Sequence, residues 1–403
     1  MSRRQWMCVL AGFVLFAFPA FSTVGAERGV TETEIRIGQW GPQTGPAALW
    51  GAVARGTGMY FHMINEEGGI HGRKIKYFMR DNGYQPPKTK AVVKELVEDK
   101  QVFAFVGGIG TADNMAVMKY LEHRKIPWVC PVGGSTAYAF PPNPYRFCFY
   151  PLYCEEATIL VDYAVKKLGK KRIAFFYLND DYGKGGLYGA EVALEKYGLK
   201  LAVAVPVEPM DTDLSSHCLK LKAAKADCVI MFVLPKHGAI MLLTAAKMGF
   251  SAQWMTSSTL SDTEIMHKIT KGLWKGVIFT IFADLPDSPN PLMKKYRSAQ
   301  KKYAASDRWG IFYYAGIVFA EPMVEGLKRC GRDLTAESFV AAMESIRDFR
   351  GIGPKITYGP GIRHGSKSSY LGKCEEGGKP VLISGLADAE IDVQEVIRRL
   401  KKQ

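Results

Sequence analysis

Short apolar runs alternate with amphipathic stretches along most of the chain, as is typical of strands that alternate with helices. The first series predicts four strands with helices between them. The predicted strands cover 35–40, 74–81, 102–106 and 126–129, and the predicted helices cover 49–67, 87–99 and 113–123. Strand, helix and strand in series indicate a parallel sheet with helices on both faces.

The same pattern starts again after about residue 151. The predicted strands cover 172–177, 201–205, 228–234, 253–256 and 276–282, and the predicted helices cover 155–168, 182–197, 213–223 and 236–248. The last third is mainly helical, over 290–303, 309–328 and 335–346, and has too few strands for a third domain. We therefore predict two α/β units, and we expect the late helices to return and cover the first sheet.

The first 26 residues have the features of a cleavable secretory signal. Arg3 and Arg4 precede an apolar run over 7–21, and Val24-Gly25-Ala26 offers the small residues that a signal peptidase reads. A membrane anchor would need about 20 apolar residues. This run is shorter and is broken by Pro19. We expect a soluble exported protein.

Length and charge narrow the function classes further. A chain of 403 residues usually forms two domains. Lys and Arg number 53 against 39 Asp and Glu, and a net charge of +14 raises the question of nucleic acid. Loss of Arg3 and Arg4 with the signal lowers this charge to +12, and an exported chain does not meet nucleic acid. The basic clusters at 166–172 and 398–402 fall at helix ends, where Lys complements the helix dipole, so no nucleic-acid partner is expected.

Neither a metal nor a cofactor is predicted. Seven cysteines follow the signal, an odd number without any C-x-x-C spacing, and the seven histidines form no H-x-x-x-H pair. The sequence leaves open which of these cysteines form disulfides. No G-x-S-x-G elbow and no G-x-x-x-x-G-K-[ST] loop occurs, so hydrolysis and nucleotide binding have no local support.

Glycine-rich turns follow two strands of the first series. Gly107–Asp113 opens a helix whose free amides, together with the Thr111 hydroxyl, favour an anion such as a small carboxylate. An ordinary N-cap is the alternative. Asp113 stands where the dinucleotide fingerprint needs its third glycine, which argues against that cofactor. Val132–Thr136 adds hydroxyls at the carboxyl edge where α/β sheets bind ligands, although a plain turn would look the same.

Four motifs follow one another between about residue 31 and residue 359. They are Gly41-Pro42-Gln43-Thr44-Gly45-Pro46, the N-x-x-G-G-I-x-G-R-x-I segment Asn65–Ile75, Asp81 with Pro86, and Asn179–Gly183. Together they resemble the branched-chain amino-acid-binding (leucine/isoleucine/valine type) periplasmic solute-binding proteins of ABC transporters. The resemblance implies a type I periplasmic-binding fold: two Rossmann-like lobes, each a parallel sheet flanked by helices, joined by three hinge crossovers with the ligand cleft between them.

The resemblance also implies a division of the chain. After the signal peptide over 1–26, the first lobe would comprise 27–150 and 283–353, and the second lobe 151–282 and 354–403. The crossovers are then expected near 149–151, 280–283 and 353–357.

Ligand-binding residues are carried over from the resemblance position by position. Thr111 matches the hydroxyl that binds the ligand carboxylate, and Gly134 or Ser135 matches a second backbone and hydroxyl contact. Trp50 and Tyr182 match aromatic residues of the two lobes, although a tyrosine at a helix start is as often part of the core. The expected ligand-binding residues are Trp50, Gly110, Thr111, Gly134, Ser135, Tyr182 and Ser258, and no catalytic residue is expected.

These observations favour a periplasmic binding protein, not an enzyme, that captures a small carboxylate-bearing solute and delivers it to a membrane permease as a monomer. The solute is an amino acid or an aromatic or aliphatic acid. Ser258 stands where the family usually has an acidic residue for the ligand ammonium, which favours a carboxylate without an amine. Asp262 or Glu264 nearby could still serve an ammonium. An exported α/β hydrolase is the alternative function.

Overall fold

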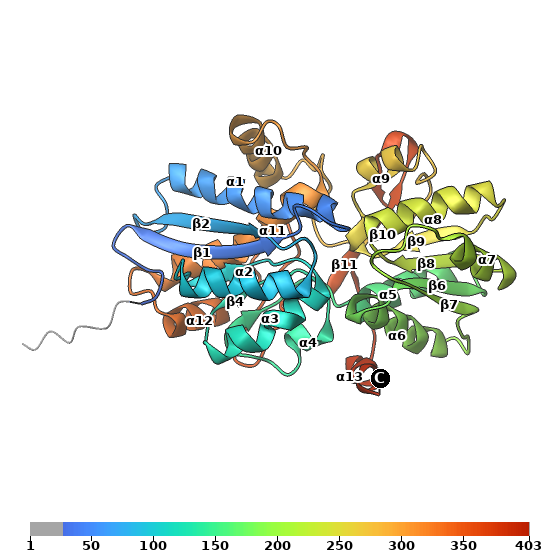
Figure 1. The fold of residues 1–403 in the computed structure, drawn as a ribbon, viewed down its shortest axis with the longest axis horizontal. Helices are drawn as coiled ribbons and strands as arrows, with labels where there is room; N and C mark the ends of the chain where they lie inside the picture. Colours follow the sequence, from blue (N-terminus) through green and yellow to red (C-terminus); the bar gives the residue numbers. More distant parts are fainter. Residues whose placement is uncertain (1–26, 403) are drawn as a thin grey trace, which may run out of the picture.

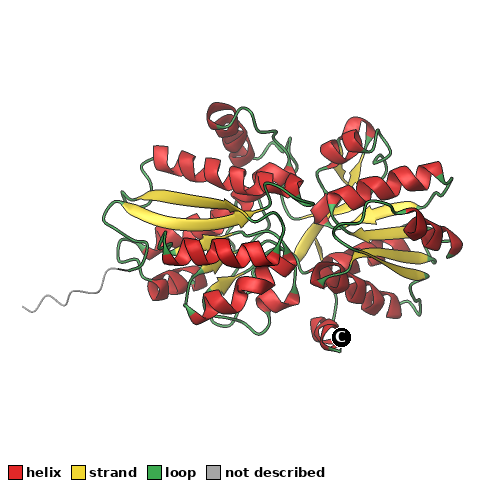
Figure 2. Cartoon of the chain, viewed as in Figure 1, coloured by secondary structure: helices red, strands yellow, loops and turns green. Residues whose placement is uncertain are grey.

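Two α/β lobes lie side by side in the computed structural model, which describes residues 27–402 (Figure 1). Each lobe has a central sheet with helices packed on it (Figure 2). The predicted fold class is therefore confirmed, whereas the predicted signal peptide lies outside the described residues. No helix within residues 27–402 is long and apolar enough to cross a bilayer.

The first sheet contains five parallel strands in the order β2-β1-β3-β4-β5. The strands are β1 (Glu34–Gly41), β2 (Lys74–Asp81), β3 (Ala104–Val106), β4 (Trp128–Val129) and β5 (Arg146–Phe147), and the helices between them are α1 (Ala52–Glu66), α2 (Pro86–Glu98), α3 (Thr111–His123) and α4 (Thr136–Ala139). Apolar residues of these strands, such as Ile37 and Phe105, are completely buried. Because the strands are parallel, the loops that follow them lie at the same edge of the sheet.

The second sheet runs in the order β12-β11-β10-β9-β8-β6-β7, with β13 paired to β11. Its strands are β6 (Ile173–Leu178), β7 (Val203–Val207), β8 (Cys228–Phe232), β9 (Gln253–Thr256), β10 (Ile278–Ile281), β11 (Ser368–Cys374), β12 (Pro380–Leu382) and β13 (Ala387–Asp388). Its helices are α5 (Tyr153–Lys166), α6 (Asp181–Glu195), α7 (Ser215–Ala223), α8 (Pro235–Lys247), α9 (Thr263–Ile269) and α13 (Val393–Lys401). β10 is parallel to β9 but antiparallel to β11. The strands β11, β12 and β13 were not predicted from the sequence.

The late helices return to the first lobe, as the sequence predicts. They are α10 (Pro291–Tyr303), α11 (Ile311–Cys330) and α12 (Ala336–Glu344). Helix α11 packs closely on α1 because glycines stand at the contact: a Cβ on Gly56 would lie 2.0 Å from the Tyr313 carbonyl oxygen, and one on Gly316 would lie 2.0 Å from that of Val53. Any larger residue at these two positions would push the helices apart.

The chain passes between the lobes three times. It leaves the first sheet after β5, returns after β10, and crosses again between α12 and β11. Before this last passage, Phe349 pairs with Ile356, and His364 forms a bridge with Cys148 beside the first passage. In the second passage, the Asp284 N–H donates a hydrogen bond of 2.9 Å to the Ile352 carbonyl oxygen. All three connecting segments therefore run close together at the junction of the lobes.

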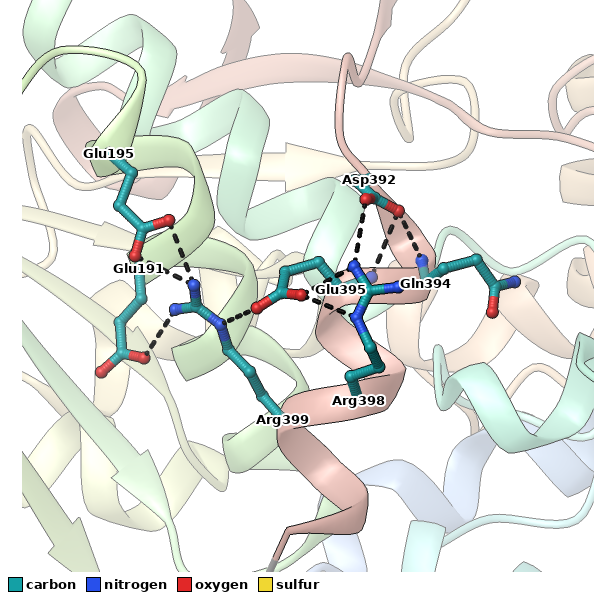
Figure 3. A network of polar contacts seen from close by, with 7 residues as sticks. All are labelled: Glu191, Glu195, Asp392, Gln394, Glu395, Arg398 and Arg399. Atoms are coloured by element: carbon teal, nitrogen blue, oxygen red, sulfur yellow. Dashed lines mark hydrogen bonds and ion pairs between the residues drawn. The ribbon is translucent and has the colours of Figure 1, made fainter.

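The C-terminal helix α13 is fixed to the second lobe by ion pairs (Figure 3). Arg399 pairs with Glu195 at 2.9 Å and Glu191 at 3.4 Å on α6, and with Glu395 at 2.9 Å on its own helix. Val396 is completely buried against the same lobe. Arg399 therefore stabilises the contact between α13 and the second lobe. This agrees with the prediction that the basic residues of the tail lie at the end of a helix.

Candidate ligand-binding site between the lobes

A cavity opens between the two lobes, where the loops after the strands of both sheets face one another. The volume of the cavity, counted together with the open space at its mouth, is about 450 Å³. It is lined by Ala47, Trp50, Tyr84, Ile109, Gly110, Thr111, Val132, Gly133, Tyr150, Tyr153, Tyr182, Val233, Leu234, Pro235 and Thr259. None of these residues carries a charge, so apolar surface and hydroxyl groups dominate the described lining. A mainly apolar cavity with a few directed polar groups is what small-molecule sites offer.

Trp50 brings the first lobe into contact with the second. It is buried, its ring lies 4.8 Å from that of Phe312 on α11, and its indole N–H donates a hydrogen bond of 3.1 Å to the Thr259 carbonyl oxygen. Thr259 belongs to the turn after β9 in the second lobe. The predicted aromatic residue of the first lobe therefore lines the cavity and also bridges the lobes.

Gly110 and Thr111 place the N-terminus of α3 on the cavity wall. The Thr111 hydroxyl lies 3.0 Å from the Tyr153 hydroxyl, which comes from the first turn of α5. The intrahelical ladder of α3 begins with the Asn114 N–H bonded to the Gly110 carbonyl oxygen at 2.8 Å. Because the N–H groups before that bond lie outside the ladder, this wall offers amide and hydroxyl donors.

Tyr182 forms the facing wall from the start of α6. Its hydroxyl lies 2.8 Å from the Ser257 hydroxyl and also contacts that of Thr259. Its ring centre is 4.6 Å from that of Tyr153. Asp180 caps α6 by accepting a hydrogen bond of 3.1 Å from the Gly183 N–H, and this cap fixes the position of the tyrosine.

The other three predicted residues lie beside the cavity and are absent from its described lining. The Gly134 carbonyl oxygen accepts a hydrogen bond of 2.8 Å from the Tyr153 N–H. Ser135 caps α4. Ser258 is completely buried, and its hydroxyl lies 2.6 Å from that of Tyr150. Gly134 and Ser258 therefore contact lining tyrosines, whereas Ser135 forms no hydrogen bond with a tyrosine of the described lining. Direct contact of the three residues with a ligand stays a prediction.

Three lining tyrosines were not predicted from the sequence as ligand-binding residues. Tyr150 and Tyr153 flank the first passage between the lobes, and Tyr84 follows β2 with a φ of 58°. A signal for the first two was present, because Tyr150 lies in the predicted crossover over 149–151 and Tyr153 follows it by two residues. Tyr84 follows a predicted strand, but a loop tyrosine carries no mark that separates a cavity wall from the core.

Two buried carboxyl groups stand behind the lining. Burial raises the pKa of Glu156 to about 7, although the Ser258 N–H donates to it at 3.0 Å and the Thr280 hydroxyl at 2.6 Å. Burial also raises the pKa of Asp113 to about 6, although Asn82 and Thr89 donate to it. The protein's donors bind only one oxygen of each group, Oε1 of Glu156 and Oδ1 of Asp113, and the second oxygen of each is buried without a hydrogen-bond partner among residues 27–402.

The replacement Glu156→Gln is expected to remove part of the pH dependence of stability. The ordinary pKa of this carboxyl is 4.5 and the folded value is about 7, so its stabilising proton is present below pH 4.5 and lost as the pH rises through about 7. Between about pH 5 and pH 8 the variant should gain up to roughly 3 kcal/mol in free energy of unfolding relative to wild type. Denaturant unfolding at both pH values checks this, with the exposed Glu66→Gln as control. A difference that does not change with pH would contradict it.

Metal binding finds no support in the part of the chain that the structure describes. No group of three or more His, Cys, Asp or Glu side chains within residues 27–402 is arranged to hold an ion. The seven cysteines within these residues form no disulfide bonds, and six of them are buried.

Comparison with known proteins identifies the family of this chain. The family model described as "Periplasmic binding protein" matches residues 34–379. The chain is 26% identical over 338 residues to the Leu/Ile/Val-binding protein homolog 3 of Brucella melitensis, covering 83% of this chain and 89% of that protein. It is 22% identical over 320 residues to a leucine-, isoleucine-, valine-, threonine- and alanine-binding protein of Pseudomonas aeruginosa, covering 78% and 83%.

Solved structures share the fold. A fatty acid ABC transporter substrate-binding protein from Thermomonospora curvata superposes with a TM-score of 0.83 at 23% identity, over 91% of this chain and 95% of that one. A branched-chain amino acid ABC transporter protein from Thermus thermophilus with bound valine gives a TM-score of 0.82 at 17% identity, over 93% and 100%. Since the family match spans most of the chain, this protein belongs to the periplasmic binding protein family.

Proposed function

We propose that this protein is the solute-binding component of an ABC importer. It captures a small carboxylate-bearing solute, an amino acid or an aromatic or aliphatic acid, and delivers it to a membrane permease. The observation that carries the proposal is the cavity itself, because both lobes contribute to its wall. Relatives named for branched-chain amino acids and for fatty acids support this ligand class, since both kinds of molecule carry a carboxylate.

Closure of the lobes around the solute is the proposed mechanism. In the lobe division proposed here, 27–150 with 283–353 form one body and 151–282 with 354–403 the other. Trp50 donates to Thr259 and Thr111 contacts Tyr153 across this division, so opening the cleft breaks both contacts. A solute that touches both walls therefore favours the closed state over the open one.

The proposed setting is the periplasm, which the chain reaches through the predicted signal peptide over 1–26. There it acts as a monomer that meets its permease after closure. No cofactor is required, because binding and release involve no bond chemistry.

The alternative, an exported hydrolase, is less well supported. Nucleophilic catalysis needs an activated nucleophile beside a general base. The described lining contains hydroxyls but no His, Cys, Asp, Glu or Lys side chain that could activate one. Binding without turnover is therefore the favoured outcome.

A ligand panel tests the proposal. The mature protein is screened by thermal unfolding against amino acids, aromatic and aliphatic acids, amides and dicarboxylates, and X-ray scattering with and without each stabilising solute then reports the radius of gyration. We expect at least one carboxylate to raise the midpoint, to make the protein more compact and to be recovered unchanged. Consumption of the solute would favour the hydrolase, and stabilisation only by solutes without a carboxylate would overturn the proposed ligand class.

A further inference from the structure

We infer that the ligand of this site is an aromatic monocarboxylate without an amino group. The inference rests on the proposed function and narrows its ligand class. Three features of the cavity carry it: the lack of an acidic side chain on its described wall, the position of its donors and the number of its aromatic rings.

An ammonium group would find no charge partner in the cavity. The position after β9 holds Ser258, which is buried and engaged with Tyr150 and Glu156. Asp262, close by, is already bound by Arg308 and accepts a hydrogen bond from the Phe312 N–H at 3.3 Å. Glu264 is paired with Arg308 at 2.6 Å. Because the carboxylates that could hold an ammonium are bound elsewhere, a desolvated amine on the ligand would be unpaired, which is costly.

The two carboxyl groups behind the wall do not change this conclusion. The Ser258 N–H and the Thr280 hydroxyl bind Oε1 of Glu156, and the Asn82 amide and the Thr89 hydroxyl bind Oδ1 of Asp113. The second oxygen of each carboxyl is buried without a hydrogen-bond partner in the described part of the chain. Neither residue belongs to the described lining. With its pKa raised to about 7, Glu156 is partly protonated near neutral pH, which weakens its attraction for a cation.

A carboxylate, in contrast, meets donors at the wall formed by α3. The hydroxyls of Thr111 and Tyr153 lie 3.0 Å apart, so one ligand group can contact both. The N-terminus of this 13-residue helix adds amides that precede its hydrogen-bonded ladder and the positive end of its dipole. Amides and hydroxyls together can hold an anion without a cationic side chain.

The remainder of the wall is suited to a flat apolar ring. Five aromatic residues line the cavity: Trp50, Tyr84, Tyr150, Tyr153 and Tyr182. The rings of Tyr153 and Tyr182 are 4.6 Å apart and those of Tyr150 and Tyr153 are 6.2 Å apart. Aromatic rings pack favourably at such separations in edge and offset arrangements, and a ligand ring can join the same cluster.

Matched ligands test the inference by calorimetry. 3-Phenylpropanoate, L-phenylalanine and 3-phenylpropanamide share a ring and a chain length, and differ only in the amine and in the charge of the acid. We expect the acid to bind at least about 100-fold more tightly than L-phenylalanine and at least about tenfold more tightly than the amide. Equal or tighter binding of L-phenylalanine or of the amide would overturn the inference, as would tighter binding of 4-methylpentanoate.

A variant at Thr111 tests whether its hydroxyl donates to the ligand carboxylate. Thr111→Val removes one hydroxyl at nearly constant volume, and with it the contact with Tyr153 across the cleft, so both ligands should bind more weakly. The loss of affinity should be about tenfold larger for 3-phenylpropanoate than for the amide. Thr244→Val on α8, outside the described lining, is the matched control. An equal loss for the acid and the amide would overturn the proposed place of the carboxylate.

Failure of the inference can be separated from failure of the proposed function. If leucine or another amino acid binds and makes the protein more compact while the three phenyl compounds do not, the inference is wrong and the solute-binding function stands. If no solute of the whole panel binds, the proposed function itself fails.

Discussion

Replacing Asp262 with alanine is expected to lower both the stability of the protein and its affinity for its ligand. The Asp262 side chain is 2% exposed and forms an ion pair with Arg308. It caps α9 through the Ile265 N–H at 3.4 Å and accepts the Phe312 N–H of α11 at 3.3 Å. One buried carboxylate therefore joins a helix start of the second lobe to a helix start of the first.

The expected loss follows from these contacts. Removal of a helix cap and of charge-assisted hydrogen bonds should cost about 2–3 kcal/mol in free energy of unfolding. Phe312 also packs on Trp50 in the cavity, so a looser junction should favour the open state and weaken ligand binding by about tenfold.

Denaturant unfolding and calorimetry with the tightest solute of the panel measure the two effects. Asp99→Ala, at an exposed aspartate whose side chain has no hydrogen bond or ion pair within residues 27–402, should leave both quantities unchanged within about 0.5 kcal/mol. Arg308→Lys keeps the charge but loses the two-pronged contact with Asp262 and Glu264, so it should fall between wild type and Asp262→Ala. Wild-type affinity in Asp262→Ala would show that this contact does not hold the lobes together.

The second large effect is expected from Gly134→Ala. A Cβ at Gly134 would lie 2.2 Å from the Pro151 carbonyl oxygen and 2.5 Å from the Tyr153 nitrogen, and both are backbone atoms of the first passage. Relief of this overlap requires a backbone shift, which should cost about 2–3 kcal/mol. Because Tyr153 lines the cavity, the same shift should weaken ligand binding by at least about tenfold.

Gly385→Ala is the matched control, since nothing lies within 4 Å of its added methyl group. It should change stability by no more than about 0.5 kcal/mol and leave affinity unchanged. Near-normal affinity in a folded Gly134→Ala variant would mean that the loop around Gly134 does not fix the position of the first connecting segment between the lobes.

The fold could be predicted to a large extent because its signals are local. Alternation of apolar runs with amphipathic stretches marks the parallel strands and their helices, and 253–256 matches β9 at both ends. β11, β12 and α13 lack such a signal. Only Val396 of α13 is buried, and β11 pairs antiparallel with a strand about 90 residues earlier, so long-range contacts decide both elements.

The candidate site could be predicted only in part. Trp50, Gly110, Thr111 and Tyr182, which were expected from the family resemblance, line the cavity. They follow parallel strands, and turns after such strands meet at one edge of each sheet. Ser258 is held by Tyr150 and Glu156, more than 100 residues earlier in the chain. A partner so distant in sequence cannot be read from local motifs, so supporting roles of this kind emerge only in the folded structure.

A crystal structure of the mature protein with the tightest-binding solute of the panel is the most direct test of the central claim that the cavity between the lobes is the binding site. We predict closed lobes, with the solute between Trp50 and Tyr182 and its carboxylate at Thr111 and Tyr153. A solute bound outside this cavity, or bound to one lobe with the cleft open, would contradict the account.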